Sequence, residues 1–213
     1  MAVRVDLNIS LDGVAAPADP TPENPMGADW GRLVEDYMAT RTFRTRVFGD
    51  TSGAGTTGID DRYAAAYFEG VGAEVMGAAM FGLHSFPDDP EWRGWWGDEP
   101  PFRVPVIVLT HRPREPIAFA NGTRFEFSSE SITDAVARAS DLADGADVRV
   151  GGGLSTVRAA LAAGIVDRLH VAVRPVVLGR GGRLWDDLPG LDTGYTVTSE
   201  VAESGVVHVT FAR

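Results

Sequence analysis

Apolar and polar residues alternate at the start of the chain, and helical spacings follow. Residues 3–11 carry an apolar side chain at every second position, which predicts a half-buried strand. Four prolines then interrupt residues 15–29, so this stretch is predicted to be a loop. Apolar positions at helical spacing predict one helix over residues 30–46 and another over residues 59–68.

Strands and helices alternate through the rest of the chain. Residues 104–110 are almost continuously apolar, which is typical of a strand in the middle of a parallel sheet. Helices of this length between strands indicate right-handed crossovers. We therefore expect residues 1–213 to form a single three-layer α/β/α domain, with a mixed, mostly parallel sheet and an antiparallel C-terminal hairpin. The other expected strands are residues 73–77, 125–127, 147–150, 169–178, 195–201 and 206–211, and the other expected helices are residues 78–83, 131–142 and 155–163.

Composition and charge exclude several classes of function. The net charge of -11 is spread along the chain, which disfavours nucleic-acid binding. The absence of cysteine excludes disulfides, thiolate metal ligands and thiol catalysis. No apolar run approaches the ~18 residues of a membrane span, and charges alternate at the N-terminus, so we expect a cytoplasmic protein. The histidines at positions 84, 111, 170 and 208 lack the spacing of metal ligands, so no metal site is predicted, and His170 and His208 are assigned to the sheet.

Three consecutive glycines between a strand and a helix are the strongest chemical signal in the chain. Glycine allows a ligand to approach the backbone closely, and the N-terminus of a helix presents free N–H groups to an anion. The segment therefore predicts a phosphate cradle, as in a dinucleotide site. It is not the G-x-G-x-x-G fingerprint, because Thr156 stands where the third glycine would be, and a tight strand-to-helix turn is the alternative. The candidate residues are Gly151, Gly152, Gly153, Leu154, Ser155 and Thr156.

A second signal lies at the end of the central apolar strand. Thr110, His111 and Arg112 follow it with a hydroxyl, an imidazole and a guanidinium. Ligands gather at the carboxyl ends of parallel strands, and such donors suit the 2′-phosphate that distinguishes NADPH from NADH. The alternative is an ordinary solvated loop.

Together, in this order, these segments resemble the dihydrofolate reductase fold family, and most closely its riboflavin-reductase-like bacterial members, the C-terminal domains of bifunctional deaminase-reductases. The resemblance extends over nearly the whole chain. Each matching segment is weakly specific by itself. The segments are Asn8–Gly13, Val75–Gly77 with Met80 and Phe81, Val108–Arg112, Gly151–Gly153, Val166–Leu169 and Pro175–Gly179.

The resemblance implies NADPH as cofactor and assigns roles to several segments. It implies a cis peptide bond between Gly151 and Gly152, against the cofactor. It also implies a lid from Asp12 onward, with Asp12, Gly13, Val14 and Ala15 facing nicotinamide. The segment Gly77, Ala78, Ala79 and Met80 corresponds to a cofactor-binding turn, but the family usually has Arg or Lys where this chain has Ala78. That departure removes one positive contact and places more weight on His111 and Arg112.

The resemblance also implies a substrate side. Asp61 lies sixteen positions before Gly77, at the spacing of the family's proton-donating carboxyl group, although it also fits an ordinary residue at the start of a helix. Asn8 on the first strand is a further candidate substrate contact. Trp92, Trp95 and Trp96 suit a heteroaromatic substrate or a dimer contact, and core packing is the third interpretation.

We therefore expect an NADPH-dependent reductase that transfers hydride to a small heterocyclic substrate of pterin, pyrimidine or imine type. One alternative is a non-catalytic dinucleotide- or pterin-binding protein of the same fold. Another is a reductase of a specialised metabolite. The resemblance further implies a homodimer.

Overall fold

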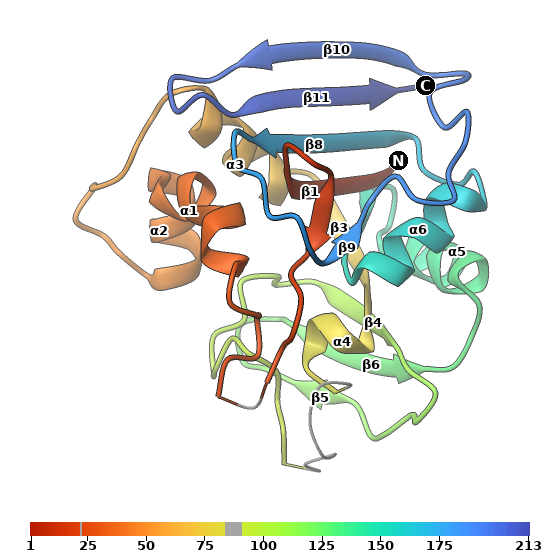
Figure 1. Cartoon of the computed structure of the whole chain (residues 1–213). Helices are drawn as coiled ribbons and strands as arrows, with labels where there is room; N and C mark the ends of the chain where they lie inside the picture. The colour runs from red at the N-terminus through yellow and green to blue at the C-terminus, as the bar shows by residue number, and fades with distance from the viewer. Residues whose placement is uncertain (22, 84–90) are drawn as a thin grey trace.

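The computed structural model describes residues 1–21, 23–83 and 91–213, and Figure 1 shows how its helices and strands are arranged. The strands are β1 (Val3–Ser10), β2 (Val14–Ala16), β3 (Val71–Gly77), β4 (Pro105–Leu109), β5 (Ile117–Ala118), β6 (Arg124–Ser128), β7 (Asp147–Gly152), β8 (Arg168–Arg174), β9 (Gly182–Arg183), β10 (Thr196–Val201) and β11 (Val207–Ala212). The helices are α1 (Trp30–Ala39), α2 (Arg41–Phe48), α3 (Ile59–Phe68), α4 (Ala78–Phe81), α5 (Ile132–Leu142) and α6 (Leu154–Ala162).

Within the described residues, nine strands form one twisted sheet in the order β10-β11-β8-β1-β7-β3-β4-β6-β5. The strands from β8 to β6 run parallel to one another. The C-terminal hairpin β10-β11 is antiparallel to β8, and β5 adds a short antiparallel strand at the opposite edge. The expected mixed, mostly parallel sheet with an antiparallel hairpin is confirmed, while β5 was not predicted.

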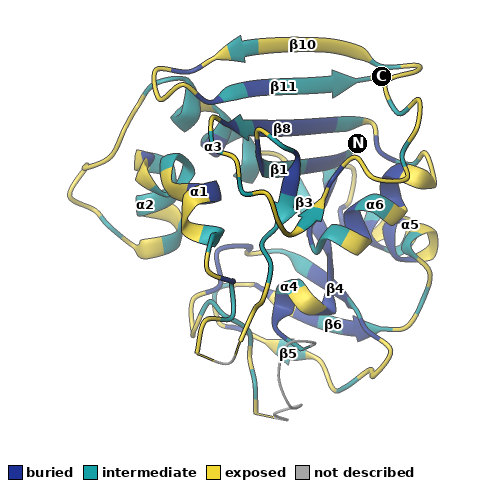
Figure 2. Ribbon diagram, viewed as in Figure 1, coloured by how far each residue is buried: buried dark blue, intermediate teal, exposed yellow. Residues whose placement is uncertain are grey.

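Helices cover both faces of the sheet. α5 and α6 pack against β3 and β7 on one face, and α1, α2 and α3 form a group on the other (Figure 1). β4 lies inside the sheet, between β3 and β6, and has no exposure at Val106, Ile107 and Val108, which explains its continuous apolar sequence (Figure 2). In the described part of the chain, no helix has the length and apolar character needed to cross a membrane.

The predicted single helix over residues 30–46 is wrong, because the structure has two helices there. Thr40 has extended backbone angles and lies between α1 and α2. Its hydroxyl accepts a hydrogen bond from the N–H of Phe43, so the threonine caps α2. It also forms a β-bridge with Thr56. A side-chain cap at Thr40 therefore ends one helix and starts the next within an uninterrupted apolar pattern.

Candidate functional site

The glycine segment turns the chain from β7 into α6 at the carboxyl end of the sheet. Gly152 and Gly153 have φ values of 144° and 79°, which L side chains rarely adopt. The expected cis bond between Gly151 and Gly152 is wrong, because this peptide bond is trans.

Packing explains why two further positions are glycine. A Cβ atom at Gly151 would lie 1.9 Å from Oε1 of Glu74, whose side chain is fully buried beneath the turn. A Cβ atom at Gly77 would lie 2.4 Å from the hydroxyl of Thr156. The ends of β3 and β7 therefore approach closely, which brings the two candidate cofactor segments together.

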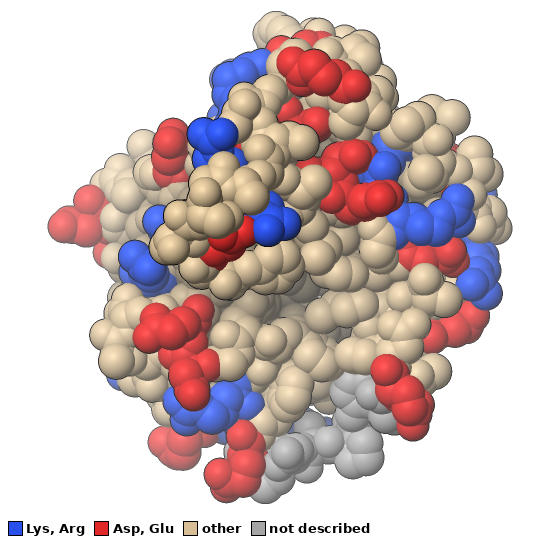
Figure 3. All heavy atoms as spheres, turned by 90° about the vertical axis from the view of Figure 1, so that its left-hand side faces the viewer, with Lys and Arg blue, Asp and Glu red and all other residues tan. Residues whose placement is uncertain are grey.

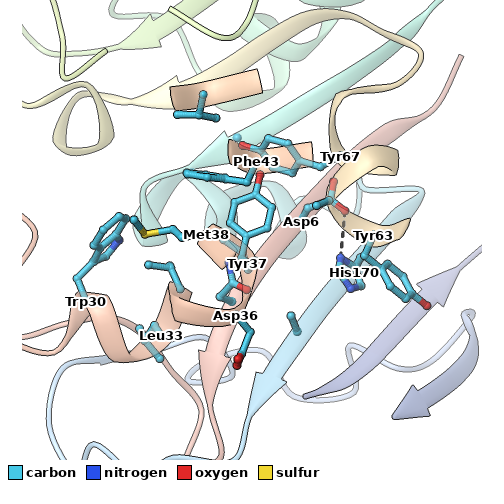
Figure 4. Close-up of a pocket in the computed structure, with 18 of the residues that line it drawn as sticks. Asp6, Trp30, Leu33, Asp36, Tyr37, Met38, Phe43, Tyr63, Tyr67 and His170 are labelled. Atoms are coloured by element: carbon cyan, nitrogen blue, oxygen red, sulfur yellow. Dashed lines mark hydrogen bonds and ion pairs between the residues drawn. The ribbon is translucent and has the colours of Figure 1, made fainter. Parts of the chain in front are cut away.

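A cavity of about 400 Å³ opens on the α1–α3 side of the glycine turn, within the usual range for ligand sites of roughly 300–1,000 Å³. Figure 3 looks onto the face where the molecule is hollowed, and Figure 4 shows side chains that line the cavity. Most of its lining is apolar or aromatic. We call it the aromatic cavity, and its ring-bearing lining includes Trp30, Tyr37, Phe43, Tyr63, Tyr67 and Trp96.

A second cavity, of about 300 Å³, lies on the other side of the same turn. We call it the polar cavity because hydroxyl groups, an imidazole and the carboxylate of Glu130 line it beside apolar side chains. It brings together candidate cofactor residues from three separate segments, and Gly153 lines both cavities. The candidate residues that line the polar cavity are Gly77, Ala78, Ala79, Thr110, His111, Gly153, Ser155 and Thr156.

Four further candidate cofactor residues line the aromatic cavity, and Arg112 lies at the surface. Gly151, Gly152, Leu154 and Met80 line the aromatic cavity. Arg112 is exposed and lies outside the lining of both cavities, and its backbone N–H donates to the hydroxyl of Thr110. Arg112 therefore belongs to the surface beside the polar cavity.

The predicted lid segment is held in place by the carboxylate of Asp12. This carboxylate accepts hydrogen bonds from the backbone N–H groups of Leu178 and Gly179 and from the hydroxyl of Ser10. These bonds lower the pKa of Asp12 from 3.8 to about 2. Ala15 lines the aromatic cavity, whereas Asp12, Gly13 and Val14 do not. The structure thus places one of the four lid residues at the cavity.

Replacing Asp12 with asparagine is expected to speed amide hydrogen exchange at Leu178 and Gly179, because an amide accepts fewer hydrogen bonds than a carboxylate. Since the folded-state pKa of Asp12 is lowered, the stabilisation that its carboxylate gives the folded wild type is present above pH 3.8 and is lost as the pH falls toward about 2. Asp19→Asn is the control, because Asp19 is exposed and forms an ion pair with the exposed Arg180. Equal exchange rates in Asp12→Asn and wild type would contradict the assignment.

The tryptophans of the aromatic insertion serve packing as well as the cavity. The indole N–H groups of Trp92 and Trp95 donate to the carbonyl oxygens of Phe81 and Met80. Trp96 stacks on Phe125 in the apolar cluster beside β4 and β6. Trp95 and Trp96 line the aromatic cavity, and Trp92 does not. Asn8, the other candidate substrate contact, also lines it.

The structure places Asp61 away from the aromatic cavity. Its carboxylate accepts a hydrogen bond of 2.7 Å from the N–H of Thr42, at the start of α2, and it is absent from the cavity lining. The preceding residue, Asp60, does line the cavity. Successive residues of a helix point about 100° apart, so only one of two adjacent carboxylates can face a given surface.

Sequence reasoning missed several polar groups of the aromatic cavity. His170 on β8 and His208 on β11 were assigned to the sheet, but both side chains line the cavity, together with Asp6 on β1. Asp36 on α1 is also there, and burial raises its pKa although the ion pair with Arg174 acts in the opposite direction. Strand alternation could have indicated these groups, because His170 and Arg174 lie on the face of β8 opposite Leu169, Val171 and Val173.

A buried ion pair supports the glycine turn from below. Arg149 on β7 pairs with Glu74 on β3, and both side chains are almost completely buried. The guanidinium also lies 3.6 Å from the centre of the Tyr67 ring, and burial raises the pKa of that phenol to about 12. Burial raises the pKa of Glu74 as well, against the attraction of Arg149. The pair joins two neighbouring strands just beneath the wall of the cavity.

The model of the RibD C-terminal domain family matches residues 1–207. None of the curated proteins matches the sequence. Among solved structures, a putative riboflavin biosynthesis protein from Shewanella sp. PV-4 is similar with a TM-score of 0.61 and 21% identity, over 100% of this chain and 99% of that chain. Dihydrofolate reductase from Enterococcus faecalis, complexed with NADP(H), aligns with a TM-score of 0.49 and 14% identity, over 100% of this chain and 96% of that chain. A pyrimidine reductase-like protein from Corynebacterium diphtheriae aligns with a TM-score of 0.45 and 15% identity, over 99% of this chain and 91% of that chain.

Proposed function

Because the chain belongs to the RibD C-terminal domain family, we propose that it is an NADPH-dependent reductase of a small heterocyclic substrate. One observation carries this proposal: two cavities of different chemistry flank a single glycine turn, and Gly153 lines both. NADPH has a corresponding division, with nicotinamide at one end, a 2′-phosphorylated adenosine at the other and a diphosphate between them.

The residues at the turn fit the diphosphate of NADPH. The backbone of Gly152 and Gly153 carries no Cβ that would stand between the two cavities. The unpaired N–H groups at the start of α6, with the hydroxyls of Ser155 and Thr156 beside them, provide donors for phosphate oxygens. When bound, NADPH supplies a hydride equivalent. The protein supplies binding, orientation and exclusion of water.

The aromatic cavity fits the nicotinamide and a flat substrate. Its aromatic lining, which includes Trp95 and Trp96, provides ring faces for stacking. The carboxylates and imidazoles along its floor provide hydrogen bonds that would orient a heterocycle of pterin, pyrimidine or imine type. The polar cavity, with Thr110 and His111, would hold the 2′-phosphate, and Arg112 would reach it from the surface.

The cofactor assignment is tested by fluorescence titration with NADPH and NADH. Replacing Arg112 with alanine is expected to raise the Kd for NADPH roughly tenfold and to leave the Kd for NADH unchanged, because one charge-assisted contact to phosphate is lost. Arg124→Ala is the matched control, because Arg124 is exposed and lies at the amino end of β6, whereas the cavities lie at the carboxyl ends of the strands. Equal affinities for the two nucleotides in wild type and variant would remove the 2′-phosphate assignment.

Catalysis is tested separately from binding. Steady oxidation of NADPH in the presence of a pterin, a pyrimidine flavin precursor or a cyclic imine is the expected result. Tight NADPH binding without turnover on any member of such a panel would favour the non-catalytic binding protein. The homodimer stays a prediction, which sedimentation velocity tests directly.

A further inference from the structure

Four titratable side chains form a continuous hydrogen-bonded string along the floor of the aromatic cavity. Asp6 Oδ1 lies 3.2 Å from Nδ1 of His170, and Nε2 of His170 lies 2.9 Å from Nδ1 of His208. Nε2 of His208 lies 2.9 Å from Oδ1 of Asp60. Figure 4 shows the first of these links, with Tyr63 beside His170. We call these four residues the Asp-His-His-Asp string.

The fold places the four side chains in line. Asp6 and His170 are register partners on the neighbouring parallel strands β1 and β8. His170 pairs across the sheet with Thr210, and His208 lies two residues from Thr210 on the same face of β11. α3 covers this face and contributes Asp60 at one end. The string therefore joins three strands and one helix.

Both imidazole rings are held in nearly one plane beneath a single aromatic ring. Tyr63 stacks on His170 and His208 with centroid distances of 4.3 Å and 4.1 Å and interplanar angles of 11° and 2°. The tyrosine hydroxyl donates to Glu200, which fixes the ring from outside. His170 and His208 are 6% and 3% exposed, so neither ring can rotate freely into solvent. The packing thus enforces the orientation in which ring nitrogens face each other.

Counting protons identifies what this geometry requires. Each of the three links needs one proton between its two heavy atoms, and two ionised carboxylates can only accept. Two neutral imidazoles supply two protons, which leaves one link with two lone pairs facing each other. One additional proton, equivalent to one imidazolium shared by His170 and His208, completes all three links. The string is therefore complete when it carries one more proton than two neutral rings do.

The surroundings shift the pKa of two members of the string, Asp6 and His208. Burial raises the pKa of Asp6, but the hydrogen bond from His170 and the charges of Arg4 and Arg149 outweigh this effect, so the net pKa is lowered. Burial and the neighbouring His170 lower the pKa of His208, and the hydrogen bond to Asp60 with the charges of Asp60 and Glu200 offsets them only in part, so the net pKa is lowered. Asp36 is a further charged group near the Asp60 end of the string, and the charge of Asp60 raises its pKa.

We propose that the Asp-His-His-Asp string stores one proton and donates it to the substrate bound in the aromatic cavity as the hydride arrives. This inference rests on the reductase function proposed above. Reduction of a C=N or C=O bond forms a C–H bond with the hydride, while the reduced nicotinamide becomes oxidised. The electron pair left on nitrogen or oxygen takes its proton from the carboxyl group of Asp60, which lines the cavity, while the string passes its extra proton from His208 to Oδ1 of Asp60. The string then holds two protons and regains the third from water. Water can reach its ends, because the side chains of Asp6 and Asp60 are 12% and 11% exposed.

The stored proton is tested without any cofactor, by NMR of protein labelled with ¹⁵N in histidine. At low pH we expect three ring N–H protons shared by His170 and His208. As the pH rises, one proton is expected to leave, with both rings changing at the same midpoint because they are coupled. Two rings that titrate independently, or that stay neutral from pH 5 to pH 8, would overturn the proposal.

Adjacent aspartates provide a matched pair of variants. Asp60→Asn removes the carboxylate from the end of the string and is expected to lower the midpoint by roughly one pH unit or more, because an opposite charge that favours the imidazolium is lost. Asp61→Asn changes the same charge one residue away, where the carboxylate contacts Thr42, and is expected to leave the midpoint in place. Equal shifts in both variants would mean that only general charge is felt, and would overturn the assignment.

Turnover on a substrate found by NADPH oxidation tests the donor role. His208→Gln is expected to lower kcat roughly 10²-fold or more, as for loss of a general acid, and to leave the Kd for NADPH within about twofold. The fall of kcat with rising pH in the wild type is expected to disappear in the variant. An unchanged kcat and pH profile would overturn the donor role. Failure of the wild type to bind NADPH would instead refute the reductase function, while the NMR midpoint would still report on the string.

Discussion

Replacing Arg149 with methionine is expected to lower the free energy of unfolding by about 3–5 kcal/mol, because it leaves the carboxylate of Glu74 buried without its partner. Glu74 is fully buried, and its Oε1 atom already has no hydrogen-bond partner. Urea denaturation at pH 7 measures the loss. The loss is expected to shrink at lower pH, because a protonated Glu74 no longer leaves a charge in the interior.

Two controls separate the ion pair from simple loss of packing. The double variant Glu74→Leu with Arg149→Met removes both charges and is expected to recover most of the stability, since buried pairs can be replaced by apolar residues at little cost. Arg124→Met breaks an exposed pair with Glu126 and is expected to change stability by less than about 1 kcal/mol. A single variant Arg149→Met that is as stable as wild type would contradict the role of the pair beneath the turn.

Replacing Gly152 with alanine is expected to weaken NADPH binding tenfold or more. Its φ of 144° is nearly restricted to glycine, and holding alanine there costs about 1–3 kcal/mol. The new Cβ would also lie 3.2 Å from the sulfur of Met80, which lines the same cavity. We expect the turn to relieve the backbone strain and the close contact with Met80 by rotating its backbone amides away from the diphosphate. Isothermal titration calorimetry with NADPH measures the change.

Gly145→Ala is the matched control, because Gly145 precedes β7 at its opposite end. It also has a positive φ, of 86°, and no atom lies within 4 Å of an added Cβ. This variant is expected to lose stability through the same kind of strain but to keep the wild-type Kd for NADPH. If both glycine variants bound NADPH as the wild type does, the turn after β7 would not be the phosphate site.

The sequence predicted the fold where local and long-range preferences agree. The continuous apolar run of β4, the alternation of β1 and the glycines after β7 all describe elements that tertiary packing then preserved. The resemblance inferred from weak segments in one order is confirmed by the family model over residues 1–207. Where one side chain changed the local outcome, as Thr40 did between α1 and α2, the apolar periodicity alone was misleading.

The candidate site was predicted only in part, because some of its residues are close together in the sequence and others are far apart. Residues close together in sequence, such as those from Gly151 to Thr156, keep their proximity in any compact fold. His170, which hydrogen-bonds Asp6, lies 164 positions away, and no spacing in the chain indicates that His170 and His208 line one cavity with Asp6. Asp60 and Asp61 are equivalent candidates in the sequence, and only the rotation of α3 against the sheet distinguishes them.

The sequence by itself determined the order of the main parallel strands and the helices between them, the glycine turn and the absence of thiol chemistry, because these depend on residue type and short-range pattern. The tertiary structure decided which side of that turn is aromatic and which is polar, which aspartate faces the cavity, and that two histidines share a hydrogen bond. The physical reason is that parallel strands become neighbours through crossovers tens of residues long. Contacts between their side chains are therefore set by register and helix packing, which local sequence does not encode.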